Sequence, residues 1–423
     1  MTQKPEILFL AHRIPYPPDK GDKIRSWRLL QYLTERFDVH LVSFIDDQRD
    51  ERHADFLREQ CASATFIAIE PALRKVVCVL GLVTGKALSV QFYRNSKMKT
   101  VIDEIRRKPL AYEIAFSSTM AQYLEQPGNA SARIIDFCDA DSEKWRRYAD
   151  AAPWPMSWVY RREATKMAVE ESNIISWADH CFAITEQEAN IFNSRAGVSK
   201  PVGWWSNGVD AEYFDPEAEF SCHEYSSDVI FTGAMDYRAN VEAVLGFVKN
   251  TWPAIREKRP QATFTIVGAR PVRELLALHQ RDGIIVTGRV DDIRPWLALA
   301  KVAIAPMRVA QGIQNKVLEA MAMGKPVVAS TAAATGLRVC DGESILIRDG
   351  VENVAGEILQ LLNDKVMRQE IGDNARRCVI EIYNWDRQLQ RFSIAIENNE
   401  FRYSSANESE DLASPPRSSA SLN

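Results

Sequence analysis

The stretch Ala305–Ser330, APMRVAQGIQNKVLEAMAMGKPVVAS, decides the fold of this chain. We expect a strand to end at Pro306, a loop to carry Gly312, a helix to begin near Asn315, and a new strand to follow the Gly-Lys-Pro sequence at 324–326. A strand–helix–strand unit requires parallel pairing with a right-handed crossover. The stretch therefore predicts an open parallel sheet in this half of the chain.

The same alternation of short apolar runs and amphipathic stretches such as Ile24–Arg36 extends along the chain. In the first half, the predicted strands are Ile7–Ala11, Val39–Phe44, Ala64–Ile69, Ile114–Phe116, Arg133–Phe137 and Cys181–Ile184. In the second half they are Val229–Thr232, Thr263–Val267, Ile284–Thr287, Val302–Ala305 and Val327–Ala329. Turn signals between Trp205 and Phe220 indicate the junction. The predicted fold class is α/β, with two tandem Rossmann-like doubly wound domains facing a cleft.

Composition excludes several classes of protein. The formal net charge of −5 gives no indication of nucleic-acid binding. The seven cysteines include no CxxC pair, so we expect reduced thiols and no zinc site. The apolar run near the N-terminus is too short for a signal peptide, and no stretch reaches the length of about 18 apolar residues of a membrane span. We therefore expect a cytoplasmic location.

The loop and helix after Pro306 have the features of an anion site. A glycine before a helix start lets backbone N–H groups approach an anion, and the helix dipole favours a pyrophosphate there. Lys316 in the first turn adds a positive charge, and Glu319 is placed to bind the vicinal hydroxyls of a ribose. The alternative is that Lys316 and Glu319 form an exposed intrahelical ion pair.

This segment resembles the signature of the retaining GT-B glycosyltransferases of family 4, which is Glu-Gly-Phe-Gly followed by Glu-Ala-Met-Ala-x-Gly-x-Pro-Val-Val. The chain has QGIQ at 311–314 and EAMAMGKPVV at 319–328, with the step from 311 to 319 preserved. The resemblance implies that Glu319 binds the ribose and that Gln311 replaces the glutamate that contacts the donor sugar. Glutamine keeps the hydrogen bonds to a sugar but loses the negative charge.

Further stretches support the same resemblance. Gly233, Gly268 and Arg289 lie in stretches similar to the loops that line the nucleotide, and Gly21 lies in a stretch similar to the loop that faces the donor phosphate. The family's phosphate-binding lysine is missing near Arg238, and Lys316 is expected to compensate. The implied donor-binding residues are Gly21, Gly233, Arg238, Gly268, Arg289, Gln311, Gly312, Ile313, Lys316 and Glu319.

Asp139 and Asp141 follow the end of a predicted strand, where the family often carries a catalytically important residue. The implied catalytic residues are therefore Asp139, Asp141, Arg238 and Lys316. For Asp141, capping of the next helix is the alternative role. His12 and Arg13 end the first strand and are expected to point into the cleft, with a structural role for His12 as the alternative.

The resemblance implies an acceptor-side domain over 1–205, a nucleotide-sugar donor domain over 206–382 and a crossover helix over 383–400 that packs back on the first domain. The tail over 401–423 is rich in Ser, Pro and acidic residues, so we expect it to be disordered. The nucleotide-sugar is a co-substrate, and no other cofactor and no metal are expected. A glycan or lipid-linked molecule is the implied acceptor. A peripheral contact with the inner face of the cytoplasmic membrane is suggested by the apolar segment Val76–Val83 and by the tryptophans and arginines over 145–166. The favoured alternatives are a buried helix for the first segment and a helix with a solvated charged face for the second.

The combination of DFCDADSEKW, GAMDYRAN and GIQNKVLEAMA is most similar to glycosyltransferases associated with exosortase/PEP-CTERM exopolysaccharide systems. The function implied is transfer of a sugar, with retention of configuration, in exopolysaccharide or cell-envelope synthesis. The alternatives are a nucleotide-sugar 2-epimerase and a non-catalytic nucleotide-sugar-binding protein. An NAD-dependent oxidoreductase ranks lowest, because no strand–GxGxxG–helix fingerprint is present.

Overall fold

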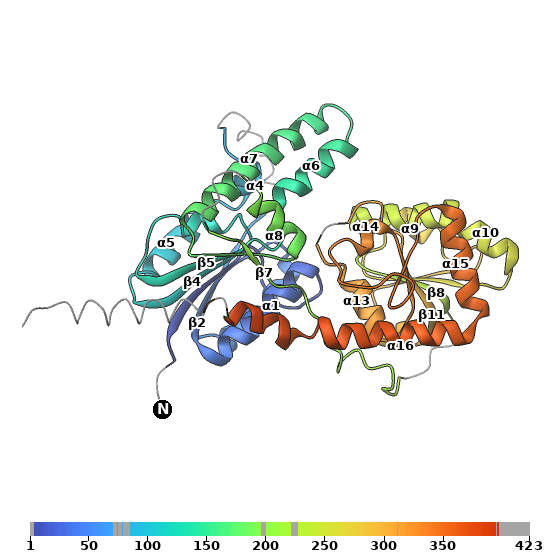
Figure 1. Ribbon diagram of the computed structural model, residues 1–423. Coiled ribbons are helices and arrows are strands. Elements are labelled where there is room, and N and C mark those ends of the chain that lie inside the picture. Colours follow the sequence, from blue (N-terminus) through green and yellow to red (C-terminus); the bar gives the residue numbers. More distant parts are fainter. Residues whose placement is uncertain are drawn as a thin grey trace, which may run out of the picture.

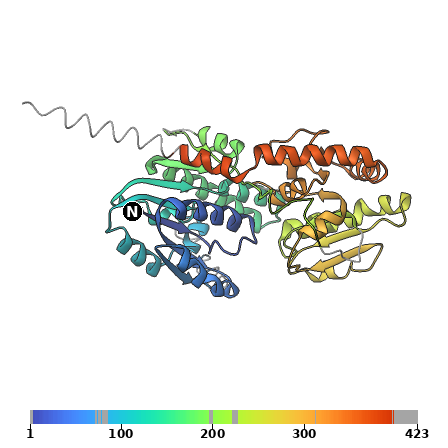
Figure 2. The same cartoon turned by 90° about the horizontal axis from the view of Figure 1, so that it is seen from below.

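The computed structural model describes residues 4–70, 74, 78, 85–195, 200–220, 227–310, 312–394 and 396. Over these residues it contains two parallel sheets, each covered by helices on both faces (Figures 1 and 2). Helices on both faces are required because both sides of each sheet are apolar. The expectation of an α/β fold with two Rossmann-like domains is confirmed, and the two domains are called N-terminal and C-terminal below.

The N-terminal domain is built on a seven-stranded parallel sheet in the order β3-β2-β1-β4-β5-β6-β7. Its strands are β1 Glu6–Ala11, β2 Asp38–Ile45, β3 Ser63–Ala68, β4 Leu110–Phe116, β5 Ala130–Asp136, β6 His180–Ala183 and β7 Gly203–Trp204. Its helices are α1 Gly21–Arg36, α2 Ala54–Gln60, α4 Leu88–Phe92, α5 Ser96–Ile105, α6 Asp141–Ala151, α7 Met156–Trp177 and α8 Glu186–Asn193, with short 3-10 turns at Gln48–His53 and Ala121–Tyr123.

The C-terminal domain has a six-stranded parallel sheet in the order β10-β9-β8-β11-β12-β13. Its strands are β8 Ser227–Thr232, β9 Phe264–Val267, β10 Ile284–Gly288, β11 Ala300–Ala305, β12 Val327–Ala329 and β13 Leu346–Ile347. Its helices are α9 Arg238–Asn250, α10 Trp252–Lys258, α11 Arg273–Leu276, α12 Arg294–Leu299, α13 Asn315–Ala322, α14 Thr331–Ala334, α15 Val351–Asn363 and α16 Lys365–Ile382. In both sheets the strand order reverses next to the first strand of the domain, which is where doubly wound folds bind ligands.

Alternating residues of β1 show how the N-terminal core is divided. Leu8 and Leu10 point to one face of the sheet, and Ile7 and Phe9 to the other. All four are fully buried. A strand buried on both faces reads as a continuous apolar run, and ILFLA at 7–11 is such a run.

The last described helix, over 385–394, returns to the N-terminal domain. Trp385, Leu389, Phe392 and Ile396 are buried in the same cluster as Ile7 and other residues of β1 and α1. Figure 1 shows this helix in red beside α1, after α16 has run along the C-terminal domain. The chain therefore passes between the domains twice, once between β7 and β8 and once at Tyr383.

Candidate active site

Three glycine loops meet at the carboxyl ends of neighbouring strands in the C-terminal domain. Gly233 follows β8 with a φ of +150°, which favours glycine. A β-carbon on Gly268 would lie 1.7 Å from the carbonyl oxygen of Gly233, so no side chain fits there. The N–H of Gly268 donates to the carbonyl oxygen of Gly288 (3.2 Å). Backbone packs directly on backbone here, which leaves this edge of the sheet without bulky side chains.

The loop before α13 touches the N-terminal domain at Gly312. Its φ is +60°, and a β-carbon there would lie 2.7 Å from Oδ1 of Asp139. Beside it, NH1 of Arg147 in α6 donates to the carbonyl oxygen of Ala310 (2.9 Å). The start of α13 is thus held against the N-terminal domain. Gln311, for which the family resemblance implies a contact with the donor sugar, lies outside the described residues.

Asn315, the first residue of α13, faces the N-terminal domain. Its Oδ1 accepts a hydrogen bond from Nδ2 of Asn207 (2.9 Å). A β-carbon on Gly21, at the start of α1, would lie 3.7 Å from Nδ2 of Asn315, and this buried amide nitrogen has no hydrogen-bond partner in the described part of the chain. The starts of α1 and α13 therefore approach each other, and their two dipoles favour an anion near this point.

Lys316 lies beneath the Gly233 loop and is not paired with Glu319. Its Nζ donates to Oδ1 of Asn240 (2.5 Å) and lies 4.5 Å from the centroid of the Phe231 ring. Burial lowers the pKa of Lys316 to about 7, although the nearby Glu319 opposes this shift. The alternative of an exposed intrahelical pair therefore does not describe this structure, because the ammonium is turned toward α9 and β8.

Glu319 is a carboxylate without a partner. Within the described ranges its side chain makes no hydrogen bond and no ion pair. Burial raises the pKa of Glu319 to about 7, with Lys316 opposing the change. A shielded carboxylate with free lone pairs is suited to accept hydrogen bonds from two hydroxyl groups. Two groups with opposite charges and pKa values shifted toward neutrality are typical of functional sites.

On the N-terminal side, Asp139 lies near several other charged groups. Burial raises its pKa, Lys144 opposes the change, and Asp141 and Asp22 add to it. Glu188 in α8 is 7% exposed, and burial followed by repulsion from Asp139 raises its pKa to about 8. Two carboxyl groups that repel each other hold one proton more readily than isolated acids do. Asp139 and Glu188 thus form an acidic pair, of which Asp139 lies against Gly312.

Glu188 is a site residue that was not predicted from the sequence. The pattern Thr185-x-x-Glu188 at a helix start is that of a capping box, and Oγ1 of Thr185 does accept from the N–H of Glu188 (3.1 Å). In a capping box the glutamate side chain would accept from the backbone N–H of Thr185. Here the Glu188 carboxylate accepts from the backbone of Ala140 instead. Its Oε2 is buried without a partner among the described residues. The capping pattern could identify the helix start but not the proximity to Asp139.

Asp141 does not cap α6. The residue before the helix, Ala140, makes no side-chain cap. Instead, the Asp141 carboxylate accepts from Oγ of Ser118 (2.6 Å) and from Nζ of Lys144 (3.2 Å). The capping alternative is therefore wrong, and Asp141 orients Lys144 beside Asp139.

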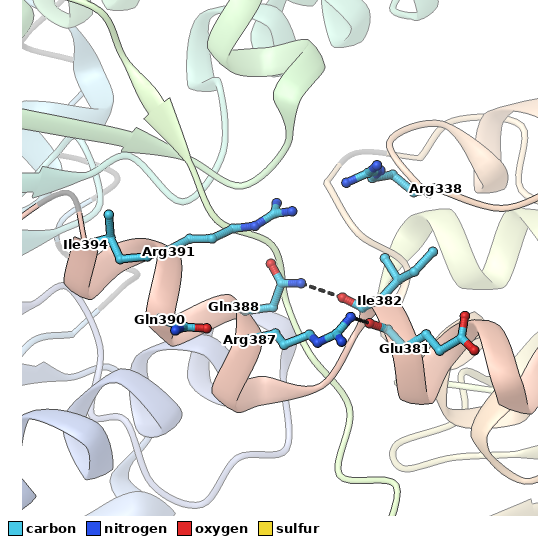
Figure 3. A pocket seen from close by; sticks show the side chains of 8 residues that line it. All are labelled: Arg338, Glu381, Ile382, Arg387, Gln388, Gln390, Arg391 and Ile394. Carbon is cyan, nitrogen blue, oxygen red and sulfur yellow. Dashed lines mark hydrogen bonds between the residues drawn. The ribbon is translucent and has the colours of Figure 1, made fainter.

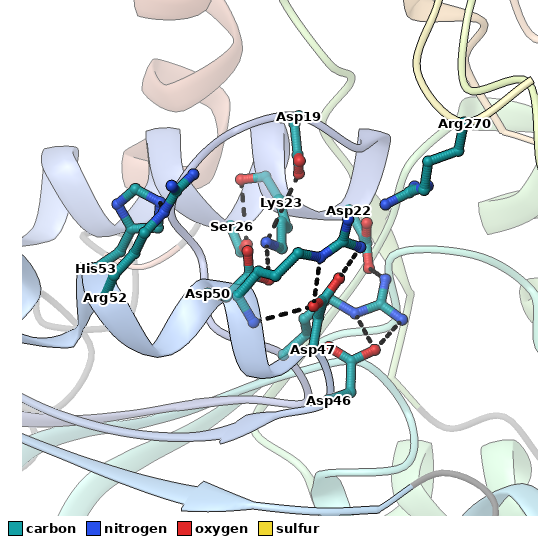
Figure 4. Close-up of polar contacts among 12 residues, drawn as sticks. Asp19, Asp22, Lys23, Ser26, Asp46, Asp47, Asp50, Arg52, His53 and Arg270 are labelled. Carbon is teal, nitrogen blue, oxygen red and sulfur yellow. Dashed lines mark hydrogen bonds and ion pairs between the residues drawn. The ribbon is translucent and has the colours of Figure 1, made fainter. Parts of the chain in front are cut away.

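His12 and Arg13 belong to a charged cluster at the end of β1. Figure 4 shows two of its acidic members, Asp22 and Asp46. Arg13 bridges Asp22 (2.6 Å) and Asp46 (2.8 Å), and Nε2 of His12 lies 3.2 Å from Asp22. Burial works to raise the pKa of Asp22, but Arg13 and His12 hold it well below its usual range. In Figure 4, Arg270 from the C-terminal domain points toward Asp22, so the cluster lies opposite the loop after β9.

Three implied donor-binding side chains are exposed or packed in the core. The Arg238 side chain is 75% exposed and pairs with Glu242 of its own helix (2.6 Å). Arg289 is exposed. Ile313 is 7% exposed and packs in the core cluster that includes Ile184 of the N-terminal domain. Around the start of α13 the structure brings together Gly21, Gly233, Gly312 and Lys316, whereas the Arg238 side chain is exposed and paired with Glu242.

Over the described residues, no group of three or more His, Cys, Asp or Glu side chains is arranged to hold a metal ion. In the same part of the chain, no helix has the length and apolar character needed to cross a membrane. Most of the apolar segment Val76–Val83, which suggested a membrane contact, lies outside the described residues.

Comparisons with known proteins agree with this fold and place the family match on the C-terminal domain. Residues 226–364 match the family model described as Glycosyl transferases group 1. An uncharacterized glycosyltransferase of Methanocaldococcus jannaschii is 28% identical over 131 residues, which is 30% of this chain and 33% of that protein. A second one from the same organism is 24% identical over 246 residues, or 52% of this chain and 60% of the relative. The matches thus span between a third and three fifths of these relatives.

Solved structures match almost the whole chain. Sucrose-phosphate synthase of Thermosynechococcus elongatus has a TM-score of 0.68 at 17% identity, with 96% of this chain and 100% of that chain covered. HepE of Anabaena, solved in complex with UDP-glucose, has a TM-score of 0.63 at 15% identity, with 93% and 100% covered. The chain has the GT-B fold of these proteins. Residues 226–364 are thus similar to the group 1 glycosyltransferases, and the chain as a whole has the GT-B fold.

Proposed function

We propose that this protein transfers a sugar from a nucleotide-sugar donor to an acceptor, with the donor held by the C-terminal domain. The observation that carries the proposal is the unpaired, shielded carboxylate of Glu319, one turn after a glycine loop and a helix start that favour a diphosphate. HepE, solved with UDP-glucose, has the same fold, which supports this class of ligand. In the proposal, Glu319 binds the ribose.

Glycosyl transfer has an oxocarbenium-like transition state, and negative charge grows on the leaving diphosphate. In our proposal the N–H groups at Gly312 and at the start of α13 stabilise that charge, because backbone dipoles need no rearrangement. Lys316 adds a full positive charge once a diphosphate is bound, since a nearby anion raises the pKa of a buried lysine. Arg238 is exposed and paired with Glu242, so Lys316 is the better candidate for this role.

The acceptor side of the proposed site is formed by Asp139, Glu188 and Asp141. Asp139 and Glu188 share a raised affinity for protons, so one of them is protonated near neutral pH and can donate to an acceptor oxygen. We propose retention of configuration, with front-face attack in which the leaving phosphate accepts the acceptor proton. The retaining mechanism rests on the motif resemblance described above. The same resemblance supports the finer assignment, which is a cytoplasmic, metal-independent family 4 enzyme of the exosortase-associated exopolysaccharide or cell-envelope group.

The proposed acceptor is lipid-linked, and the hairpin of α6 and α7 supports it. Figure 1 shows this hairpin projecting from the N-terminal sheet. At its tip Trp154 is 82% exposed and Trp158 is 57% exposed, and Met156 is also exposed. Exposed tryptophans near arginines are typical of surfaces that rest in the headgroup region of a membrane. In α6, Arg147 also contacts the loop before Gly312, so the hairpin joins the tip to the proposed site.

The experiment that tests the proposal is a thermal-shift screen with UDP-, GDP-, ADP- and TDP-sugars. A ligand at roughly 100 times its Kd stabilises the folded state by about 2.7 kcal/mol. We expect one nucleotide class to stabilise the wild type, and transfer to follow when extracted lipid acceptor is added. Stabilisation with release of an altered free sugar nucleotide would indicate a 2-epimerase instead. Stabilisation without turnover on that acceptor would indicate a binding protein.

A further inference from the structure

A hollow lies where the chain returns to the N-terminal domain, apart from the candidate active site. Figure 3 shows it between the end of α16, the helix over 385–394 and the loop that carries Arg338. Its volume is about 340 Å³, and its lining includes Arg338, Arg387 and Arg391. A neighbouring hollow of about 80 Å³ shares Arg338 and Arg391 and extends to Trp204 and Ser206. We call the two together the hinge groove.

Arginines from both domains face each other across the hinge groove. Arg338 belongs to the C-terminal domain, and Arg391 belongs to the helix packed on the N-terminal domain. In Figure 3 their side chains extend toward one another, while the Glu381 carboxylate lies on the far side. Neither guanidinium has an ion-pair partner within the described ranges. Burial, followed by the charge of Arg338, lowers the pKa of Arg391. Glu186, which lines the smaller hollow, opposes this lowering but forms no ion pair with Arg391. Two arginines that lack an ion-pair partner in the described part of the chain and converge on one hollow favour an anion between them.

Hydrogen bonds fix the floor of the hinge groove, which also contains one polar atom without a partner among the described residues. The N–H of Ser206 donates to Oε1 of Gln388 (2.9 Å), and Nε2 of Gln388 donates to the carbonyl oxygen of Ile382 (2.6 Å). Ser206 is 5% exposed, yet its Oγ is buried without a hydrogen-bond partner in the described part of the chain. Arg391 is held in place by the Trp204 ring, 4.2 Å from its centroid. The groove thus offers fixed donors without a partner.

We propose that the hinge groove binds a small phosphate-bearing anion, and that the bound anion fixes the two domains relative to each other. Guanidinium groups match phosphate oxygens in geometry and charge. The volume of the larger hollow lies within the range of about 300–1,000 Å³ that is usual for small-molecule sites. The ligand joins Arg338 of one domain to Arg391 on the other, so its binding couples to domain closure. This site is separate from the diphosphate site proposed at α13 and does not depend on it.

The test is calorimetric titration of the full chain with inorganic pyrophosphate. Arg338→Ala and Arg391→Ala remove the proposed ligands, Lys316→Ala removes a cation of the other site, and Arg281→Ala is a control with an exposed arginine outside both. We expect a site that persists in Lys316→Ala and Arg281→Ala. We expect its affinity to fall at least about ten-fold in Arg338→Ala and in Arg391→Ala, because each loses a charge-assisted pair.

Three results would overturn the proposal. The first is wild-type affinity for pyrophosphate in both Arg338→Ala and Arg391→Ala. The second is loss of pyrophosphate binding in Lys316→Ala alone, which would assign the pyrophosphate to α13. The third is an equal loss in Arg281→Ala, which would indicate nonspecific attraction. Arg338 has an exposed side chain, so Arg338→Ala should fold, and a circular dichroism spectrum checks this. Small-angle scattering with and without pyrophosphate then measures closure, which Arg338→Ala should abolish.

Discussion

Oδ1 of Asp139 occupies the space that a β-carbon on Gly312 would need, at 2.7 Å. Asp139 follows β5 in the N-terminal domain, and Gly312 lies in the loop before α13 in the C-terminal domain. The contact joins the proposed acceptor side of the site to the proposed diphosphate side. The absence of a side chain at residue 312 therefore sets how closely the two domains approach at this point.

Gly312→Ala should reduce sugar transfer by pushing Asp139 away and by straining a backbone with a φ of +60°. The strain alone costs about 1–2 kcal/mol. Gly342→Ala is the matched control, because Gly342 has a φ of +80° and open space around its α-carbon. We expect both variants to lose stability through this strain and only Gly312→Ala to lose ten-fold or more of kcat/KM, on the order of 1.4 kcal/mol. Equal transfer rates in the two variants would contradict a role for this contact.

Glu319→Ala should abolish most of the thermal stabilisation by the correct nucleotide-sugar, because it removes the acceptor for the ribose hydroxyls. Gln311→Glu restores the residue of the family signature and should leave nucleotide stabilisation largely intact. The measurement is the ligand-dependent shift in Tm for each variant against the wild type. Normal donor binding by Glu319→Ala would show that the ribose assignment is wrong.

The titration of Glu319, Glu188 and Lys316 should give the free energy of unfolding of the unliganded protein a minimum near pH 7–8. Burial raises the pKa of Glu319 to about 7 and, with Asp139, that of Glu188 to about 8, so the folded state binds more protons than the unfolded state above pH 4.5. Stability from these groups therefore falls as pH rises toward 7 and 8. Burial lowers the pKa of Lys316 to about 7, so its contribution rises between pH 7 and 10.5.

Chemical denaturation from pH 5 to 10 checks this pH dependence in the wild type, Glu319→Gln and Glu188→Gln. Each glutamine variant should flatten the fall in its own window, which ends near pH 7 for Glu319 and near pH 8 for Glu188. Glu125→Gln is a control for an exposed glutamate on the N-terminal domain. A slope unchanged by Glu188→Gln would mean that this carboxyl titrates normally in the folded state.

The hairpin tip predicts binding to anionic membranes. Trp154→Ser with Trp158→Ser should weaken cosedimentation with vesicles of phosphatidylglycerol and phosphatidylcholine at least about ten-fold, since two exposed aromatic side chains lose their burial in the headgroup region. Val366→Ser is the control, because Val366 is 77% exposed on α16. Binding that persists in the double variant would place the membrane contact elsewhere or exclude it.

Most of the fold could be predicted because its strands are apolar on both faces. The predicted strand Val327–Ala329 has the same bounds in the structure, and the other predicted strands shift by at most a few residues at their ends. The two-residue strands β7 and β13 were missed, because so short a pairing leaves no periodic pattern. Helix α16 was also missed, since its exposed positions are so numerous that few apolar residues mark its buried face.

The candidate site could be predicted only where backbone and local sequence determine it. The glycine loop and the helix start at Asn315 follow from local pattern, and the structure has them at those residues. The direction of Lys316 toward Asn240, and the approach of Glu188 to Asp139, depend on contacts between segments far apart in the chain. The domain limits at 205 and 382 and the roles of the individual site residues remain predictions.

The helix over 385–394 supplies Trp385, Leu389 and Phe392 to the core of the domain that begins the chain. During synthesis on the ribosome, this face of the N-terminal domain therefore stays uncovered until residues 385–396 have been made. A protein shortened before residue 385 would leave that apolar face exposed to solvent, and we expect it to aggregate.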